Sequence, residues 1–271
     1  MRSSRHTKPV GLTLVELLVV FGIVTLLMVL LFPAVQSARA SARATSCRNN
    51  LKQMGLGLAN YHSARGHFPP GSDLLAGTEF AWSAHLLPYL EYSSISEQID
   101  FGLPWNAVGE NAIAADMNLP IYSCPNALAL FNGKQDYGGI IGTSLLSLNL
   151  GFGPFDAFGT GTLIITHPDQ PQPVKSSSIL DGLSNTLCVG ESVDRLDDEA
   201  ARWACGKNCF AQNEKWINVE QSDSLHSHHL QGAHGLFADG HVKLLTEDIQ
   251  TEVLGALCTR NAGDRSSESI N

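Results

Sequence analysis

The strongest constraint in this sequence is a single long apolar run near its start. Residues 14–35 read LVELLVVFGIVTLLMVLLFPAV, and Glu16 is the one charged residue among them. An α-helix of about 20 residues spans the roughly 30 Å hydrocarbon layer of a bilayer. The run therefore predicts a membrane-spanning helix, around which the remainder of the chain has to be organised.

The charges that precede the run predict its orientation. The leader contains Arg2, Arg5 and Lys8 and no acidic residue. Basic segments stay on the cytoplasmic side of a membrane helix. We therefore expect a single-pass protein of the inner membrane, with a cytoplasmic N-terminus and a C-terminal head in the periplasm or outside the cell.

Two simpler explanations of the apolar run stay open. A cleaved secretory signal has an apolar core of about 7–15 residues followed by an A-x-A-like site. The run is longer than that, although residues 37–40 supply small side chains at its end. A plain membrane anchor accounts for the length, but it gives Glu16 no partner, and a carboxylate inside a bilayer is costly unless it is paired.

The residues around Glu16 form a more specific pattern. Residues 11–18, GLTLVELL, follow the basic leader and begin the apolar run. This arrangement resembles the prepilin signal of type IV pilins and type II secretion pseudopilins. The resemblance implies cleavage between Gly11 and Leu12 by a prepilin peptidase/methyltransferase, and N-methylation of Leu12. It also implies that Glu16 pairs with the N-terminal amine of a neighbouring pilin-like subunit. Most members of the family have phenylalanine where this chain has Leu12.

A helical pattern continues beyond the membrane segment. Apolar or small residues recur at helical spacing, and no proline lies between Pro33 and Pro69. These residues are Val35, Ala38, Ala42, Leu51, Met54 and Leu58. The pattern predicts one helix over about residues 13–62, kinked near Pro33, which ends before Gly66 and the FPPG turn at 68–71.

From about residue 72 the pattern changes to short apolar runs separated by Gly, Pro, Asn and Asp. Helices are predicted at 83–92, at 94–99 and after Asp248, and strands at 138–142, 161–166, 186–191, 235–238 and 241–245. Asp239-Gly240 is a hairpin-turn signal between the last two strands. The predicted fold class is α+β, with a long N-terminal pilin-like helix packed on a globular head that has an antiparallel sheet.

Four consecutive parts are thus expected. They are a cytoplasmic leader at 1–11 that is removed, a transmembrane segment at 12–35, an amphipathic continuation of the helix at 36–66, and an exported globular head at 67–271. The head is acidic, because the chain from Asp73 onward has 25 acidic and 9 basic residues, a net charge of −16. A field of that sign repels phosphate backbones, so no nucleic-acid partner is expected.

Short motifs of the head resemble a known family as well. They occur in order at 60–62 (NYH), 68–71 (FPPG), 87–91 (LPYLE), 124–125 (CP), 179–186 (ILDGLSNT), 237–240 (FADG) and 257–261 (LCTRN). The chain resembles the pilin-like family of unknown function that is abundant in planctomycetes and has a C-terminal H-X9-DG motif. His229, followed by nine residues and then Asp239-Gly240, fits that motif. The resemblance implies kinship and architecture, but it implies no biochemical role.

The histidines raise the question of a metal site, since histidine is a common ligand of zinc and copper. Five of them lie within sixteen residues: His226, His228, His229, His234 and His241. Neighbouring residues of a strand point to opposite faces, so this spacing does not converge on one ion. We predict no metal site and no cofactor, with Ca²⁺ at Asp239 and nearby carbonyls as the open alternative. The structural interpretation is a turn at Asp239-Gly240 and a hydrogen bond from His229 to nearby backbone.

The chain has six cysteines, which an oxidising compartment could join in disulfides. Cys205 and Cys209 are close enough for a loop-closing bridge and form the candidate disulfide. Their C-x3-C spacing is not that of a C-x-x-C redox centre, and no second close pair supports a zinc site. Several of the six can equally be small buried apolar residues.

Patterns of catalysis are missing from the sequence, which has no G-x-S-x-G, P-loop or H-E-x-x-H motif. The chain is therefore predicted not to be an enzyme. The predicted function is a pilin- or pseudopilin-like structural subunit of a type IV pilus or type II secretion-like assembly, processed by prepilin peptidase. The alternative is a membrane-anchored extracytoplasmic module that binds a ligand or metal and does not polymerise. Glu16 favours the first function, because a monomeric anchor gains nothing from an acid in lipid.

Overall fold

The computed structural model describes residues 13–73, 77–128, 130–144, 159–166, 173–195, 197–212, 216–219 and 224–261. The predicted leader and cleavage site, with Gly11 and Leu12, lie outside these residues. The chain divides into two compact units, Met1–Ala42 and Arg43–Asn271.

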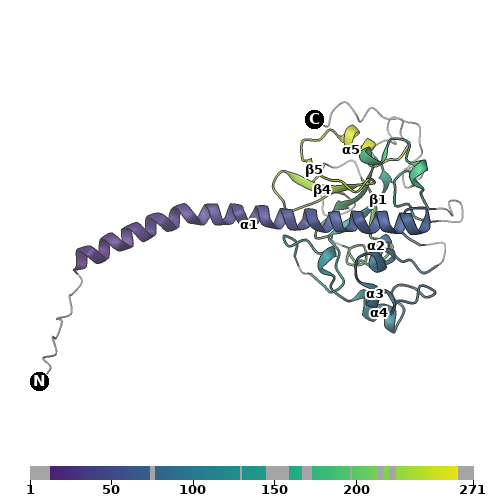
Figure 1. Cartoon of the computed structure of the whole chain (residues 1–271), viewed down its shortest axis with the longest axis horizontal. Helices are drawn as coiled ribbons and strands as arrows, with labels where there is room; N and C mark the ends of the chain where they lie inside the picture. The colour runs from purple at the N-terminus through teal and green to yellow at the C-terminus, as the bar shows by residue number, and fades with distance from the viewer. Residues whose placement is uncertain are drawn as a thin grey trace, which may run out of the picture. The chain divides into compact units, whose positions relative to one another are not determined.

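Helix α1 is the longest element and extends over Leu14–Arg65 (Figure 1). Its 52 residues confirm the single long helix predicted from the sequence, and it continues through Pro33. Gly66 follows it with a φ of +78°, a conformation that glycine adopts at little cost at a helix end. By length and composition, α1 is the one helix among the described residues that could cross a membrane.

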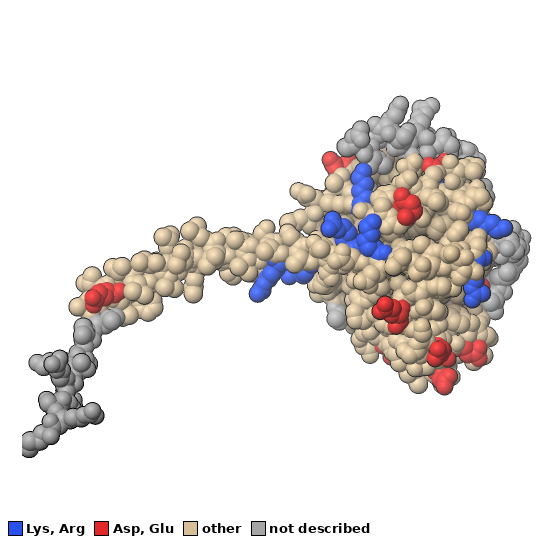
Figure 2. All heavy atoms as spheres, in the orientation of Figure 1, with Lys and Arg blue, Asp and Glu red and all other residues tan. Residues whose placement is uncertain are grey.

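The surface of α1 differs sharply along its length. Between Glu16 and Arg39 it carries no charged side chain, as Figure 2 shows. Seventeen large apolar side chains from Leu14 to Val35 are 41% to 78% exposed within the described chain. A surface of this kind is stable in hydrocarbon rather than in water, which fits a single membrane span.

The first turn of α1 is closed by a capping box between Thr13 and Glu16. The amide and hydroxyl of Thr13 donate to one carboxylate oxygen of Glu16 at 2.8 and 2.7 Å. The amide of Glu16 donates back to the Thr13 hydroxyl at 3.3 Å. This is the S/T-x-x-E pattern of a helix start. It gives Glu16 a partner within its own chain, which the apolar pattern alone did not indicate.

The second unit is built on one five-stranded sheet with the strand order β3-β1-β2-β4-β5. The strands are β1 (Tyr137–Thr143), β2 (Leu187–Glu191), β3 (Cys209–Gln212), β4 (Gly232–Phe237) and β5 (Val242–Thr246). Neighbouring strands pair antiparallel, except that β3 is parallel to β1. The α+β class is confirmed. The sheet is mixed rather than wholly antiparallel, because its edge strand β3 runs parallel to β1. The sequence around β3 has no strand pattern, so this strand was not predicted.

Short helices accompany the sheet. They are α2 (Trp82–Leu86), η1 (Leu87–Tyr89), α3 (Ser93–Ser96), α4 (Glu110–Ala115), η2 (Pro120–Tyr122), η5 (Ser176–Ser178), η6 (Leu183–Asn185) and α5 (Thr251–Leu257). The helix predicted at 83–92 is divided into α2 and η1, because Pro88 has no amide hydrogen to continue the α-helical ladder. The last helix confirms the prediction of a helix after Asp248.

The strand predicted at 161–166 is not a strand of the sheet. Its backbone bonds go to two different partners, so no ladder forms. The amide of Leu163 donates to the carbonyl of Ile140 in β1, whereas the carbonyl of Ile164 accepts from the amide of Gly71. In contrast, the predicted hairpin is present, with β4 and β5 paired on either side of Asp239-Gly240 and a φ of +86° at Gly240.

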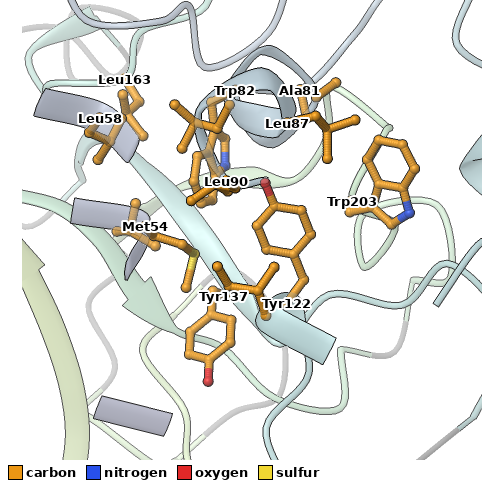
Figure 3. Close-up of a cluster of buried hydrophobic side chains, with 14 of the residues drawn as sticks. Met54, Leu58, Ala81, Trp82, Leu87, Leu90, Tyr122, Tyr137, Leu163 and Trp203 are labelled. Carbon is orange, nitrogen blue, oxygen red and sulfur yellow. The ribbon is translucent and has the colours of Figure 1, made fainter. Parts of the chain in front are cut away.

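One face of the second half of α1 packs against the core of the second unit, and its other residues are mostly exposed. In Figure 1, β4, β5 and α5 lie on one side of it, and α2, α3 and α4 lie on the other. Figure 3 shows Met54 and Leu58 of α1 in one buried cluster with Trp82, Leu90 and Tyr122. The helical spacing of Leu51, Met54 and Leu58 thus identified the buried face correctly.

Two glycines let α1 approach its neighbours closely on both sides. A Cβ atom at Gly55 would lie 2.8 Å from Leu236 Cδ1 and 3.3 Å from the Cα of Gly240. A Cβ atom at Gly57 would lie 2.8 Å from Leu90 Cδ2. Glycine inside a helix normally costs stability. Here the missing side chains allow Leu236 of β4 and Leu90, directly after η1, to pack on the helix backbone.

His85 in α2 gives the second unit an expected dependence on acid. Its ring stacks on Phe101 with 5.2 Å between ring centres, and its buried Nε2 has no hydrogen-bond partner among the described residues. Burial lowers the pKa of this imidazole from 6.5 to about 4. The unfolded chain therefore binds the proton more readily, and stability is lost as the pH falls from about 6.5 to about 4.

We expect this residue alone to remove about 2–3 kcal/mol of unfolding free energy over that pH interval. Denaturant melts of the full chain in detergent at pH 7, 5.5 and 4.5 measure the loss. A His85→Leu variant should show a smaller loss than the natural chain. An identical pH dependence in both proteins would contradict the assignment.

Candidate functional site

Four side chains with metal-binding or nucleophilic atoms meet inside the second unit. They are the thiols of Cys47 and Cys124, the carboxylate of Glu191 and the imidazole of His229. One ligand atom from each lies within 4.8 Å of every other, and all four residues are buried. They come from four segments that are far apart in the sequence. We call them the Cys-Cys-Glu-His cluster.

The helix and the turn after η2 position the two cysteines. Cys47 precedes Leu51 and Met54 on the buried face of α1, so the helical repeat that forms the core also directs its thiol inward. Cys124 begins the CP motif, and its amide donates to Oδ2 of Asp136 at 2.8 Å. Both cysteines therefore sit on backbone that the fold holds in place.

The sheet positions Glu191 and His229. Glu191 is the last residue of β2, and its carbonyl accepts from the amide of His226 at 2.9 Å. The amide of Val193 in turn donates to the carbonyl of His226 at 3.1 Å. This short parallel pairing aligns the segment before β4 with the end of β2, and so it brings the ring of His229 to the carboxylate of Glu191.

Direct contacts connect the cluster. Nε2 of His229 lies 3.6 Å from Sγ of Cys124 and 3.3 Å from Oε1 of Glu191. The other oxygen of Glu191 accepts from the amide of His234 at 2.7 Å and lies 3.2 Å from its ring Nδ1. Nδ1 of His229 is 3.0 Å from the side-chain amide of Asn126. The ring of His229 thus contacts side chains of the cluster, and the predicted hydrogen bond to nearby backbone is wrong.

The electrostatics favour the charged forms of three of the four groups despite their burial, whereas the hydrogen bond to Cys124 and burial raise the pKa of the Cys47 thiol. Burial alone would raise the pKa of Glu191, but hydrogen bonds from His229 and His234 outweigh it and lower that pKa to about 2. Burial alone would lower the pKa of His229, but Cys124 and Glu191 outweigh it and raise that pKa to about 9. The Cys47 thiol hydrogen-bonds to Cys124 and lowers the pKa of Cys124. The charged ring of His229 is therefore stabilised by the Cys124 thiolate and the Glu191 carboxylate, beside a Cys47 thiol that keeps its proton.

Next to this cluster lies a buried ion-pair network around Lys134. Its ammonium lies 2.5 Å from Asp136 Oδ1 and 2.7 Å from Asp194 Oδ1, and all three side chains are buried. Nε2 of His228 lies 2.7 Å from the second oxygen of Asp194. Asp136 also holds the amide of Cys124, so the network supports the backbone on which one cysteine of the cluster sits.

The other predicted site residues lie elsewhere. Asp239 accepts from the amide of His241 at 2.9 Å and forms the expected turn with Gly240. Its carboxylate contacts the ring of His241 and not that of His229. Cys205 and Cys209 are both buried, and the Cys209 thiol donates to the carbonyl of Gly206 at 3.2 Å. The disulfide between them stays a prediction.

Three chemical uses of the Cys-Cys-Glu-His cluster are conceivable. The four side chains can bind a metal ion, since thiolate, imidazole and carboxylate are its common protein ligands. The two cysteines can be oxidised to a disulfide. A thiolate beside an imidazolium can also act as a nucleophile. Cys124 and His229 are both buried in the described structure, so a substrate would have to enter the core to reach that pair, whereas the first two uses need no such access.

Sequence reasoning missed this cluster. The five neighbouring histidines point to His229, but Cys47 and Cys124 are only two of six cysteines, and Glu191 is only the last residue of the strand predicted at 186–191. The available signals were the helical phase of Cys47 with Leu51 and the position of Cys124 before a proline. Neither signal shows which other residues the two cysteines contact in the folded chain.

Comparison with known proteins gives a family and nothing more specific. A family model with the description "Protein of unknown function (DUF1559)" matches residues 36–222, which is more than half of the chain. The matched region includes Cys47, Cys124 and Glu191 and ends before His229. No curated protein and no solved structure matches the chain.

Proposed function

Since this chain belongs to the family of proteins of unknown function DUF1559, whose description names no activity, we propose a function from its own residues. It is a pilin- or pseudopilin-like structural subunit of a type IV pilus or type II secretion-like assembly. It is anchored in the inner membrane by α1, with the leader in the cytoplasm and the second unit exported. Its partners are a prepilin peptidase/methyltransferase and other pilin-like subunits.

The single observation that carries this proposal is the composition of α1. Its first part exposes apolar side chains on every face, and a single acid lies in the first turn. Its later part supplies buried side chains to the second unit. The same helix thus offers an apolar surface to lipid or to neighbouring helices with its first part, and contributes side chains to the core of the second unit with its later part. A subunit held in an assembly by its N-terminal helix needs this combination.

A membrane-anchored module that binds a ligand or metal without polymerising is the second candidate. The observation behind it is the Cys-Cys-Glu-His cluster, which gives the second unit a set of possible metal ligands whatever its state of assembly. Crosslinking of the cleaved chain in membranes distinguishes the two candidates. Ladders of crosslinked subunits support the structural subunit, and monomers alone support the binding module.

Processing at Gly11 is the most direct test of the proposal. We expect the chain produced together with a prepilin peptidase to begin at Leu12 with a methylated amine. Mass spectrometry of the mature N-terminus measures cleavage and methylation together. A Gly11→Leu variant should keep residues 1–11, because the small residue before the cut is replaced by a bulky one. A Gly22→Leu variant, which is changed inside the apolar run, is the control and should be processed normally.

The result that contradicts the proposal is equally specific. If the natural chain keeps its leader in the presence of an active peptidase, or if cleavage occurs near residues 37–40, the segment is not a prepilin signal. The second outcome would identify a secretory signal instead.

A further inference from the structure

We propose that Cys47, Cys124, Glu191 and His229 form a structural zinc site in the second unit. The inference concerns the exported unit alone and does not depend on whether the chain polymerises. It reverses the expectation from the sequence that the protein has no metal site.

The ligand types fit zinc well. Two thiolates, one imidazole and one carboxylate are each common ligands of Zn²⁺, and a tetrahedral set of sulfur and nitrogen ligands is typical of this ion. Calcium and magnesium prefer oxygen ligands, so the thiols make the cluster unsuitable for them. The second unit therefore holds a site for a softer cation than the Ca²⁺ considered at Asp239 and nearby carbonyls.

The spacing of the ligand atoms fits a tetrahedron. With Zn–S bonds of about 2.3 Å and Zn–N or Zn–O bonds of about 2.0–2.1 Å, tetrahedral geometry places sulfur and nitrogen about 3.6 Å apart and nitrogen and oxygen about 3.3 Å apart. The observed distances from His229 Nε2 are 3.6 Å to Cys124 Sγ and 3.3 Å to Glu191 Oε1. Cys47 Sγ lies within 4.8 Å of the other three ligand atoms, so a small rotation of its side chain completes the set.

Outer contacts hold the ligands in orientation. Oε2 of Glu191 accepts from His234, which leaves Oε1 directed at the cluster. Nδ1 of His229 faces the carboxamide of Asn126. The atom that faces the ring is Nδ2, at 3.0 Å, so the carboxamide has to be turned over to present its oxygen; Nδ1–H would then donate to that oxygen, and Nε2 would keep a lone pair for the metal. Such second contacts are a regular part of zinc sites, because they fix the ring and raise its basicity.

The site would be structural rather than catalytic. Four protein ligands fill a tetrahedral coordination sphere and leave no position for water or substrate. All four are buried. The ion would join α1, the turn after η2, the end of β2 and the segment before β4. Binding of zinc would therefore stabilise the packing of the helix against the sheet.

The competing use of the same residues is a disulfide between Cys47 and Cys124. It would remove two of the four ligands, so the two states exclude each other. The oxidising conditions outside the inner membrane make this alternative real. The experiment therefore has to measure metal content and thiol state on the same sample.

The test is metal analysis of the full chain purified in detergent without chelators. We expect one Zn²⁺ per chain, and we expect Co²⁺ exchanged into the site to show the absorption of a tetrahedral thiolate complex. Cys124→Ser and His229→Gln should each lose zinc to background levels. Cys258→Ser and His241→Gln change the same residue types away from the cluster, and both should keep the full metal content.

A second measurement covers variants that fail to fold. Chelation of the natural protein should lower its Tm, and added Zn²⁺ should restore it. The proposal is overturned if the reduced natural protein takes up no zinc, or if peptide mapping finds a Cys47–Cys124 disulfide in protein from native membranes. It is also overturned if iron or copper occupies the four residues in place of zinc.

Discussion

Replacing Lys134 by methionine is expected to lower the free energy of unfolding by about 3–5 kcal/mol. The ammonium of Lys134 is buried between Asp136 and Asp194, at 2.5 and 2.7 Å. Methionine keeps most of the apolar stem but removes the charge, so two buried carboxylates lose their common counter-ion. The cost comes from leaving a buried charge without compensation.

The design includes a matched control on the surface. Lys207 pairs with Glu199 at 2.5 Å, but both side chains are more than half exposed. Exposed ion pairs contribute little to the free energy of unfolding, so Lys207→Met should leave the denaturant midpoint nearly unchanged. Equal losses of unfolding free energy in the two variants would show that the buried ion pairs of Lys134 stabilise the fold no more than the exposed pair does.

A change of pH refines the same experiment. Burial raises the pKa of the Asp136 carboxyl above its ordinary value, even with Lys134 beside it. Without the lysine, that carboxyl should be neutralised at a still higher pH. The difference in stability between the natural chain and Lys134→Met is therefore expected to shrink as the pH falls from 7 towards 5.

The Glu16→Gln substitution is expected to reduce assembly by roughly tenfold or more while leaving cleavage after Gly11 intact. This prediction rests on the proposed function. Glutamine can replace glutamate in a capping box with Thr13, so the helix start is preserved. What it removes is the negative charge that would pair with the terminal amine of a neighbouring subunit.

The capping box supplies the control for this test. Thr13→Val removes the hydroxyl that both donates to Glu16 and accepts from its amide, but it keeps the carboxylate. If assembly depends on charge, Thr13→Val should assemble well and Glu16→Gln poorly, as measured by crosslinking in membranes. The reverse order would mean that Glu16 matters only for the start of its own helix.

Local patterns in the sequence were enough to predict the elements that depend on neighbours in sequence. The apolar run and the helical spacing of Leu51, Met54 and Leu58 predicted α1 and its buried face. The Asp239-Gly240 signal predicted the hairpin of β4 and β5. In each case the physical cause acts over a few residues: a repeat of 3.6 residues or a tight turn.

The Cys-Cys-Glu-His cluster could not be predicted in this way. Its members are separated by 77, 67 and 38 positions, and none of the intervals is a metal-binding spacing. Their meeting depends on the approach of α1 to the sheet and on the pairing of Ser192 with His226 beside β2. The parallel strand β3 escaped prediction for the same reason, because its partner β1 lies far upstream.

The close contact between α1 and the hairpin also determines when the protein can complete its fold. Lys52 donates to the carbonyl of Gly240 at 3.0 Å, across 188 positions of sequence. A ribosome adds about 5–20 residues per second, so α1 emerges roughly 10–40 s before that hairpin exists. During this interval the face with Leu51 and Met54 has no strand to cover it. Every newly made chain is therefore expected to need its apolar helix face shielded, by the export machinery in the topology that we propose, until the strands of the hairpin are synthesised and end that exposure.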